Sequence, residues 1–281
     1  MTLLGLGLRL PAIAALGGEP PIPPLDLSAL TALPEGRQAA ATAAAETAAT
    51  TLSVSAQSII DALAVGRGLA SFIPNDGCLL ASSGGATTVQ GDPVGAIRSW
   101  TGTELATQSN ASLRPTSAAA GLSTDGSKTV DLGNLSAYSA PESFIIFNNA
   151  ANTINTNYWY ISTAAGAQRT AACPNNTNGA VLENFGADAR ANVGIAEGTL
   201  NGKFIYNVGV SSGNRTHRIN NDAAIDVAIT QGIATSSTLL SSPAGFFTGN
   251  LLAFALNSTN YSTAQRNAVR EFCKAYYGVT Y

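Results

Sequence analysis

Few of the side chains that usually carry catalysis occur in this sequence, and they are scattered. His217, in the stretch NRTHRINND, is the only histidine, so a Ser-His-Asp triad would have to use it. Glycosidases place two acids close together, for example as E-x-D-x-x-E on one strand, whereas Glu142, Glu183 and Glu197 are isolated along the chain. We expect His217 to be an exposed or paired histidine on a strand, and we expect the chain not to be an enzyme.

The best local group of oxygen ligands is Asn220, Asn221 and Asp222. A calcium loop draws several oxygen ligands from alternating positions, and an Asn-Asn-Asp run equally fits an ordinary β-turn. We expect a turn here, with no metal ion and no cofactor.

The three cysteines, Cys78, Cys173 and Cys273, are too few and too far apart for a zinc site or a disulfide scaffold. We expect buried free thiols. The alternative is one bridge between Cys78 and Cys273, which open and close the expected β domain, since the two ends of a sandwich can lie side by side.

The densest aromatic group is Tyr158, Trp159 and Tyr160, in the stretch NYWYIST. On a strand, Tyr158 and Tyr160 share one face and Trp159 points to the other. One side is expected in the core, and the other is a candidate surface for stacking on a sugar. For that second side we favour a core or subunit contact over sugar stacking.

The composition narrows the class of protein. Hydrophobic residues make up 45% of the 281 residues and charged residues only 11%, with a net charge of −3. About a quarter of the residues in an average soluble domain are charged. A surface of Ala, Ser, Thr, Asn and Gly fits a protein in a large assembly or outside a cell. The charge balance gives no reason to expect nucleic acid as a partner, and no apolar run is long enough for a membrane span.

The N-terminal third has the composition of an arm followed by a helix. Residues 1–34 are apolar and rich in Gly and Pro, which predicts an extended arm that lies against another protein. Residues 35–73 are alanine-rich and follow Pro34, which predicts one long helix. Apolar positions four and three apart form the heptad seam of a coiled coil: Ala45, Ala49, Leu52, Ala56, Ile59, Leu63, Gly66, Ala70 and Ile73.

A single helix of such small side chains buries too little apolar area to hold itself. We therefore expect residues 35–73 to associate between chains, as a homotrimer by first choice, and we expect a chain that begins at Asn75 to fold without them. The alternative is one amphipathic helix packed on its own globular domain.

From Pro74 the sequence changes to short apolar stretches separated by Asn, Gly, Asp and Ser, such as ESFIIFNNA, KFIYNVGV and FFTGNLLAFALN. This pattern predicts an antiparallel β-sandwich or jelly roll over residues 74–281. The chain then closes with a helix that Ser262 or Thr263 caps and Gly278 ends. One face of that helix carries Val269, Phe272, Cys273 and Tyr276.

Three motifs occur in order along this region: GDPVGAIRSWTG, then LRPT followed by a DG turn, then FFTGNLLAFALNSTNYSTAQRNAVREFCKAYYG. Together they resemble the concanavalin A-like (laminin-G-like) jelly-roll domains at the ends of many tailed-phage structural proteins. The resemblance covers about three quarters of the chain. After the Asp125-Gly126 turn the family often has two aspartates and an aromatic, where this chain has SKTV. The family's cation site is therefore not expected here.

The resemblance implies a C-terminal concanavalin A-like antiparallel β-sandwich. With the extended arm and the α-helical, coiled-coil-like stalk expected from the composition, we expect a mainly β protein. The resemblance also implies a non-enzymatic fibre or decoration protein on the surface of an extracellular phage particle. Residues 1–34 would attach it to capsid, collar or tail proteins, and the jelly rolls would adhere to host-surface glycans. The alternatives are a secreted bacterial lectin or adhesin, and a glycoside hydrolase on the same fold.

Overall fold

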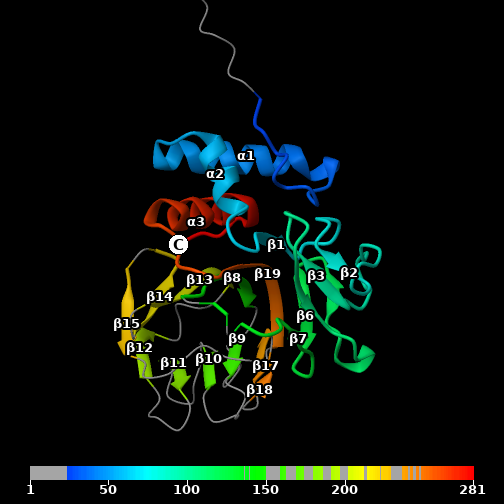
Figure 1. Cartoon of the computed structure of the whole chain (residues 1–281), viewed down its shortest axis with the longest axis vertical. Helices are drawn as coiled ribbons and strands as arrows, with labels where there is room; N and C mark the ends of the chain where they lie inside the picture. The colour runs from blue at the N-terminus through cyan, green and yellow to red at the C-terminus, as the bar shows by residue number, and fades with distance from the viewer. Residues whose placement is uncertain are drawn as a thin grey trace, which may run out of the picture.

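The computed structural model describes residues 24–135, 137–138, 140–149, 159–162, 169–173, 180–185, 191–196, 202–211, 214–221, 223–228, 236–239, 241–242, 245–246 and 248–281. Within these ranges the chain is mainly β, with two large antiparallel sheets beneath a layer of helices (Figure 1). The predicted mainly β, antiparallel sandwich is confirmed.

Sheet A is the name used here for the sheet that touches the helices. Its described strands follow the order β15-β14-β13-β8-β19-β6-β5, and β1 also pairs with β19. Their bounds are β1 Leu69–Ser71, β5 Thr116–Ala118, β6 Gly121–Asp125, β8 Glu142–Asn149, β13 Gly202–Ser211, β14 Asn214–Ile219, β15 Ile225–Ala228 and β19 Thr248–Asn257.

Sheet B is the second large sheet, with described strands in the order β12-β11-β10-β9-β16-β7-β4-β3-β2. Their bounds are β2 Leu79–Leu80, β3 Ala96–Arg98, β4 Glu104–Thr107, β7 Val130–Asp131, β9 Trp159–Ser162, β10 Arg169–Cys173, β11 Ala180–Phe185, β12 Ala191–Ala196 and β16 Ser236–Leu239. A separate small hairpin joins β17 (Ser241–Ser242) to β18 (Gly245–Phe246).

Sheet A is buried on both faces at its centre. In β8 the run Phe144–Phe147 is apolar without alternation and at most 1% exposed, and in β19 the run Leu251–Leu256 is at most 3% exposed. A strand with only one covered face would alternate apolar and polar residues. Sheet B covers one face of these strands and the helix layer covers the other (Figure 1).

Helices α1 (Glu35–Leu52), α2 (Ala56–Leu63) and α3 (Thr263–Tyr277) pack on one another above the sandwich (Figure 1), and a short 3-10 turn covers Ala111–Leu113. The prediction for the C-terminal helix is confirmed. Ser262 and Gln265 form a reciprocal capping box, and Gly278 ends the helix with a left-handed φ of 63°. Val269, Phe272 and Cys273 are buried.

The prediction of one continuous helix over residues 35–73 is wrong. Helix α1 ends at Leu52, where Ser53 adopts a left-handed conformation with φ 55°, and α2 starts again after Ser55. The Ser55 side chain accepts from the backbone N–H of Ser58. Serine and threonine compete with helical hydrogen bonds and favour caps, so the TTLSVS stretch breaks the helix. Ala70 lies on strand β1.

The positions of the predicted seam are occupied within a single chain, which corrects the proposed inter-chain stalk. Burial is nearly complete for Ala45, Ala49, Ile59, Leu63 and Ala70, while Leu52, Ala56 and Ile73 are partly buried against the same core. The small side chains of α1 allow close approach to α3, an element of the same chain. The structure thus realises the alternative, packing on the chain's own globular domain, with two helices instead of one.

The described part of the predicted arm, residues 24–34, also packs on its own chain. Leu30 and Leu33 are buried in the core, and Leu25 and Leu27 lie partly buried against it. The backbone N–H of Ala32 donates to the carbonyl oxygen of Trp100 at 2.7 Å. The arm boundary at residue 34 is therefore too late, and residues 1–23 lie outside the described residues.

Candidate functional site

A cleft of about 610 Å³ opens between α1, the C-terminal end of α3 and one end of sheet A. We call it the helix–sheet cleft. Its polar lining comes from Arg37, Thr47, Asp76, Asn148, Lys203, Tyr276 and Tyr277. Most of its remaining wall is made of small side chains: Ala40, Ala43, Ala44, Ala119, Ala120 and Ala275.

The alanines of α1 explain why this space stays open. Ala40, Ala43 and Ala44 recur at helical spacing and share one side of the helix. The β5–β6 turn contributes Ala119 and Ala120 to the lining. Because none of these side chains extends beyond Cβ, the elements meet without filling the gap between them.

Asp76 anchors the polar end of the cleft. It lies in a turn between Asn75 and Gly77, both with positive φ, and its side chain has no exposed surface. Its Oδ1 atom pairs with Nε of Arg37 at 2.7 Å. Its Oδ2 atom accepts from the hydroxyls of Ser71, at 2.5 Å, and Tyr276, at 3.1 Å.

The electrostatics of this turn follow from burial. Desolvation raises the pKa of Asp76, while the Ser71 hydroxyl, the Arg37 charge and the Tyr276 hydroxyl all act to lower it. Burial, and then the charge of Asp76, raise the pKa of Tyr276, so its phenol stays protonated and donates. The carboxylate therefore accepts two hydrogen bonds through Oδ2, while Oδ1 is held by the ion pair with Arg37.

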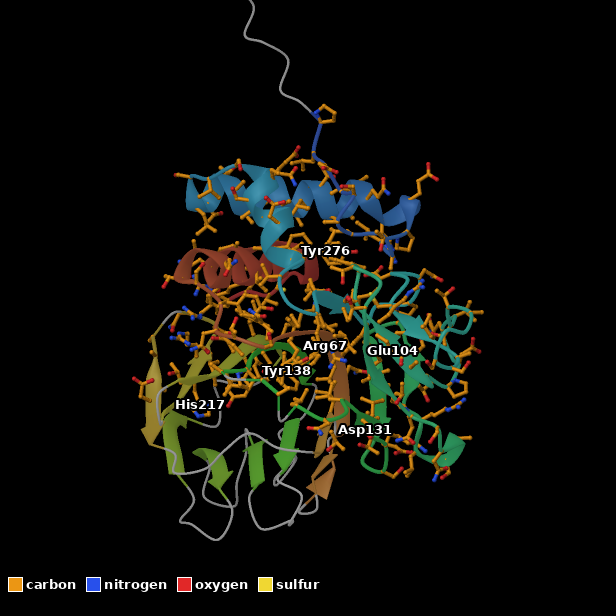
Figure 2. The ribbon with its side chains drawn as sticks, viewed as in Figure 1. Arg67, Glu104, Asp131, Tyr138, His217 and Tyr276 are labelled. Carbon is orange, nitrogen blue, oxygen red and sulfur yellow. The ribbon has the colours of Figure 1, made fainter. Side chains whose placement is uncertain are left out.

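An aromatic cluster fixes Tyr276 in place. Its ring stacks on Phe272 with centroids 5.4 Å apart, and it meets Trp100 and Tyr277 edge-on at 5.4 and 5.0 Å. Trp100 is fully buried, and its indole N–H donates to the backbone carbonyl of Asp76 at 3.0 Å. Figure 2 shows Tyr276 where the helix layer meets the sandwich. Such edge-on and offset pairs contribute about 1 kcal/mol each beyond burial.

Asn148 and Lys203 form the sheet side of the cleft. They are direct partners in the register of β8 and β13, so their side chains project from the same face of sheet A. The Lys203 ammonium donates to the backbone carbonyl of Tyr277 at 2.7 Å. This bond ties the start of β13 to the C-terminal end of α3.

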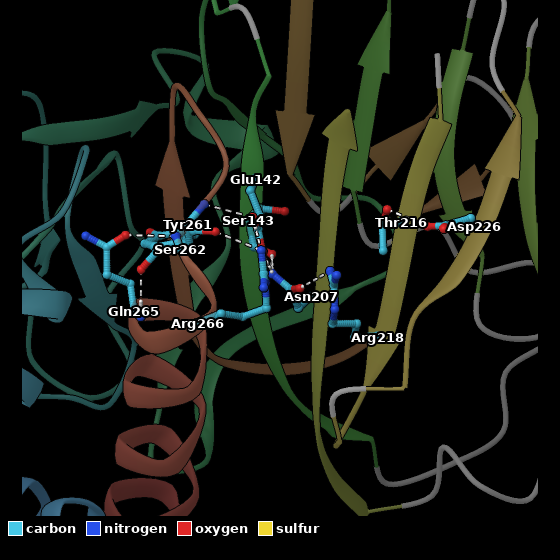
Figure 3. Close-up of polar contacts among 10 residues, drawn as sticks. All are labelled: Glu142, Ser143, Asn207, Thr216, Arg218, Asp226, Tyr261, Ser262, Gln265 and Arg266. Carbon is cyan, nitrogen blue, oxygen red and sulfur yellow. Dashed lines mark hydrogen bonds and ion pairs between the residues drawn. The ribbon is translucent and has the colours of Figure 1, made fainter. Parts of the chain in front are cut away.

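Glu142 is held in a separate network beside the start of α3 (Figure 3). Its side chain is 1% exposed and pairs with Arg266 through both oxygens, at 2.7 and 3.2 Å. The amide of Asn207 donates to Oε1 at 2.8 Å, and the backbone N–H of Tyr261 donates to Oε2 at 2.9 Å. With every acceptor direction used, this acid joins β8, β13 and α3 and has no reactive position.

His217 is buried and paired on a strand, so of the two expected alternatives, exposed or paired, the structure has the second. It lies on β14, and its Nδ1 atom is 2.6 Å from the hydroxyl of Tyr206 on the neighbouring strand. In Figure 2 it lies away from Tyr276 and the cleft. The sequence does contain one G-x-S-x-G pattern, from Gly209 to Gly213, that the sequence analysis overlooked. Its Ser211 pairs with Asn214 in a strand-to-strand hairpin instead of opening a strand-to-helix turn.

The remaining predicted sites have mixed outcomes. Asn220 and Asn221 form a turn: Asn220 has φ 61° and accepts from the N–H of Ile205, and Asn221 accepts from the N–H of Ala223. Asp222 lies outside the described residues. No group of three or more His, Cys, Asp or Glu side chains that would hold a metal occurs in the described ranges.

The cysteine prediction of free thiols holds for Cys78 and Cys273, and the alternative bridge between them is not formed. Cys78 Sγ accepts from the backbone N–H of Ser71 and donates to the carbonyl of Asp76, while Cys273 faces the core from α3. Burial raises the pKa of both thiols, so neither is reactive. Cys173 ends β10, and nothing is described of its side chain.

The aromatic candidates for sugar stacking are placed only by their backbone. Trp159 and Tyr160 begin β9 in sheet B, opposite Leu239 and Thr238 of β16. Their side chains and all of Tyr158 lie outside the described part, as does Glu197, and Glu183 is placed only by its backbone on β11. These predictions remain untested.

Sequence reasoning missed every polar residue of the helix–sheet cleft except Tyr276, which it placed on the inner face of the last helix. Asp76 lies in an NDG stretch, whose residue types indicate only a turn. The available signal was an aspartate between two turn residues, followed by a tryptophan, but no spacing connects Asp76 to Arg37 or Lys203. Only the fold brings these three together.

A second, mainly apolar groove of about 530 Å³ lies between α2 and the start of α3. Leu52 from the predicted seam lines it, together with Val54, which is 47% exposed, and Ala268. Its charged lining is limited to Asp61.

Among the helices that the structure describes, none has the length and apolar character of a membrane span.

No family model matches the chain, and no curated protein matches it in sequence. Similar solved structures include domain 4 of an extracellular arabinanase from Geobacillus stearothermophilus in complex with arabinotriose, at 12% identity and a TM-score of 0.39, covering 53% of this chain and 74% of that one. The CBM40 domain of a Ruminococcus gnavus sialidase bound to α2,3 sialyllactose has 8% identity and a TM-score of 0.42, covering 53% and 95%. Mouse laminin α1 domains LG4-5 have 9% identity and a TM-score of 0.35, covering 49% and 43%. These scores are too low to argue for a ligand or an activity in this chain, so the fold rests on its own sheet topology.

Proposed function

We propose that this protein is a glycan-binding β-sandwich protein whose ligand lies in the helix–sheet cleft. The observation that carries the proposal is the fixed polar rim of this open cleft. Arg37 and Tyr276 are held by Asp76 and Lys203 by the carbonyl of Tyr277, and Asn148 lies beside Lys203 in register. Sugar hydroxyls both donate and accept, so they suit a rim that mixes amide, guanidinium and ammonium groups.

The rim side chains are held in place by contacts within the protein, which favours a ligand that binds without rearranging them. A rim whose side chains are ordered before the ligand arrives loses little conformational entropy on binding. Because the walls are lined by alanine, the full width of the cleft is open to a ligand. A hydroxyl-rich oligosaccharide would lie along α1, with its polar groups toward Asn148 and Lys203.

A glycan array tests the proposal. The full chain is expected to bind a set of immobilised glycans, and Asn148→Ala is expected to weaken that binding about tenfold, since one good hydrogen bond to a ligand is worth about 1.4 kcal/mol. The matched control is Gln38→Ala, which removes an exposed amide of α1 that does not line the cleft. Glycan binding that Asn148→Ala leaves unchanged would contradict the assignment of the site.

We further propose that the protein is not an enzyme. Support comes from Asp76 and Glu142, whose carboxylate oxygens are engaged by neighbouring donors and so are poorly placed for acid–base chemistry. Release of reducing ends from a panel of polysaccharides is the test. Activity that is lost in Glu183→Gln or Glu197→Gln would overturn this part of the proposal.

The virion setting is a proposal from the sequence resemblance alone. In it, the protein is a fibre or decoration component on the surface of a phage particle, assembled as a homotrimer and attached through the part of the predicted arm 1–34 that precedes residue 24. Because the seam positions are occupied within one chain, a trimer would have to use another surface, such as the α2–α3 groove around Val54. Light scattering on the full chain tests the trimer, and a monomer would contradict it.

A further inference from the structure

We infer that the helix–sheet cleft selects glycans that carry a carboxylate, with Arg37 and Lys203 as the groups that hold the anion. The inference rests on the proposed function and adds the ligand's chemical class. It comes from the charge balance of the cleft, which differs from that of the whole chain. The chain carries a net charge of −3, whereas the cleft lining contains two cations and a single acid.

The acid does not neutralise the cleft mouth. Asp76 has no exposed side-chain surface, and both its oxygens face donors inside the protein. Its negative charge therefore acts on Arg37 from the protein interior. Because Asp76 is shielded from the open side of the cleft, Lys203 and the exposed part of Arg37 determine the sign of the electrostatic potential that a ligand meets there.

Both cations keep free donors. A guanidinium has five N–H groups, and Arg37 uses only Nε, toward Asp76, and one Nη2 hydrogen, toward the carbonyl of Pro74 at 3.2 Å. Its side chain remains 36% exposed. An ammonium has three N–H groups, and Lys203 uses one toward Tyr277.

A planar carboxylate is the anion that these donors fit best. The remaining Nη hydrogens of Arg37 lie in one plane and suit a carboxylate's two oxygens, and Lys203 supplies a second point charge. Asn148, opposite Lys203, is placed to accept from or donate to a hydroxyl of the same sugar. A neutral sugar in this position would supply no counter-charge to Lys203 and would leave Arg37 with Asp76 alone.

The test compares two forms of one glycan by calorimetric titration of the full chain: oligogalacturonate and its methyl ester, which has the same chain without the charge. We expect the acid form to bind at least about tenfold more tightly, as for a charge-assisted pair in place of a neutral one. Its affinity should fall as sodium chloride is raised, and that of the ester should not.

The charge itself is tested with Lys203→Gln, which keeps an amide donor for the Tyr277 carbonyl. We expect this variant to lose about tenfold in affinity for the acid form and to lose less for the ester, so that the preference for the acid form shrinks. Lys128→Gln is the matched control, because it removes the same charge from a lysine that bonds Ser112 and does not line the cleft. Arg37 is left intact, since its loss would strand the buried charge of Asp76.

The outcomes separate this inference from the proposed function. Equal affinity for both forms, with both weakened by Asn148→Ala, would overturn the charge selectivity and leave glycan binding in the cleft standing. Binding of neither form would also overturn the selectivity for carboxylates, while neutral glycans captured on the array and lost in Asn148→Ala would still support the proposed function. An affinity for the acid form that Lys203→Gln does not change would place the anion elsewhere.

Discussion

The pKa of the Asp76 carboxyl group is subject to opposing influences. Burial favours its neutral form, while Ser71, Arg37 and Tyr276 favour its charged form, and the net result is a pKa above the usual 3.8. A group of this kind binds more protons in the folded than in the unfolded state between the two pKa values. Its contribution to stability is therefore complete below pH 3.8 and is lost as the pH rises through the folded pKa.

The first prediction follows from that sign. The unfolding free energy of the natural chain minus that of Asp76→Asn should decrease as the pH is raised from below 3.8. Urea denaturation across this range measures it. A difference that grows with pH would mean that the ion pair to Arg37 outweighs burial.

Gly121 illustrates a backbone requirement at the same scale. It turns β5 into β6 with φ +114°, and a Cβ atom added there would lie 2.1 Å from the carbonyl oxygen of Leu251 on β19. We expect Gly121→Ala to reduce the unfolding free energy by about 3 kcal/mol or more, from strain and the clash together.

Gly133→Ala is the matched control for this second prediction. Gly133 also has a positive φ, of +77°, but a Cβ there meets nothing within 4 Å. Its replacement should cost only the backbone strain, about 1 kcal/mol. Equal losses of stability in the two variants would show that the contact with β19 is not as close as described.

At the scale of elements, helix α1 depends on packing with α3. Ala45 of α1 is fully buried in the core, whereas Ala39 on the same helix is exposed. The third prediction is that Ala45→Leu destabilises the single chain by about 2 kcal/mol through overpacking, while Ala39→Leu changes stability by less than about 0.5 kcal/mol. Thermal unfolding of both variants measures this. If the Ala45→Leu chain unfolds at the same temperature as the natural chain but no longer associates with other copies, the inter-chain helical seam would be supported instead.

The elements differ in how well their sequence predicts them. Helix α3 was predicted to its caps because Ser262, Gln265 and Gly278 act locally. The central strands were predicted because apolar runs such as FIIF require cover on both faces. The break between α1 and α2 was not, because a heptad pattern tolerates Ser53 and Ser55 as ordinary polar positions, and only the cap geometry shows that they end one helix and begin another.

The helix against which α1 packs also could not be predicted from the local sequence. Small residues at seven-residue spacing predict close packing and say nothing of which helix is packed against. The cleft has the same limit: Arg37, Asp76 and Lys203 are distant in sequence, and their contacts depend on sheet register and on the docking of α3. Contacts between residues far apart in the chain produce no repeating pattern in the sequence, whereas a helix or strand does.

At the scale of the molecule, the helix layer is part of the folded domain. Ile59, Ile60, Leu63 and Phe72 are almost fully buried, and β1 completes pairing along β19. The fourth prediction is that a chain beginning at Pro24 unfolds cooperatively like the full chain, whereas a chain beginning at Asn75 does not fold, contrary to the expectation from sequence. Circular dichroism melting of both chains decides this. A cooperative transition in the shorter chain would make the helices dispensable.

The central claim is that glycan binds where α1, α3 and sheet A meet. Residue-specific amide chemical-shift mapping of the full chain during titration with oligogalacturonate tests it most directly. The account predicts shifts that centre on Arg37, Ala40, Asn148, Lys203 and Tyr276. Shifts confined to β9–β12, around Trp159 and Tyr160, with the cleft residues unmoved, would contradict it.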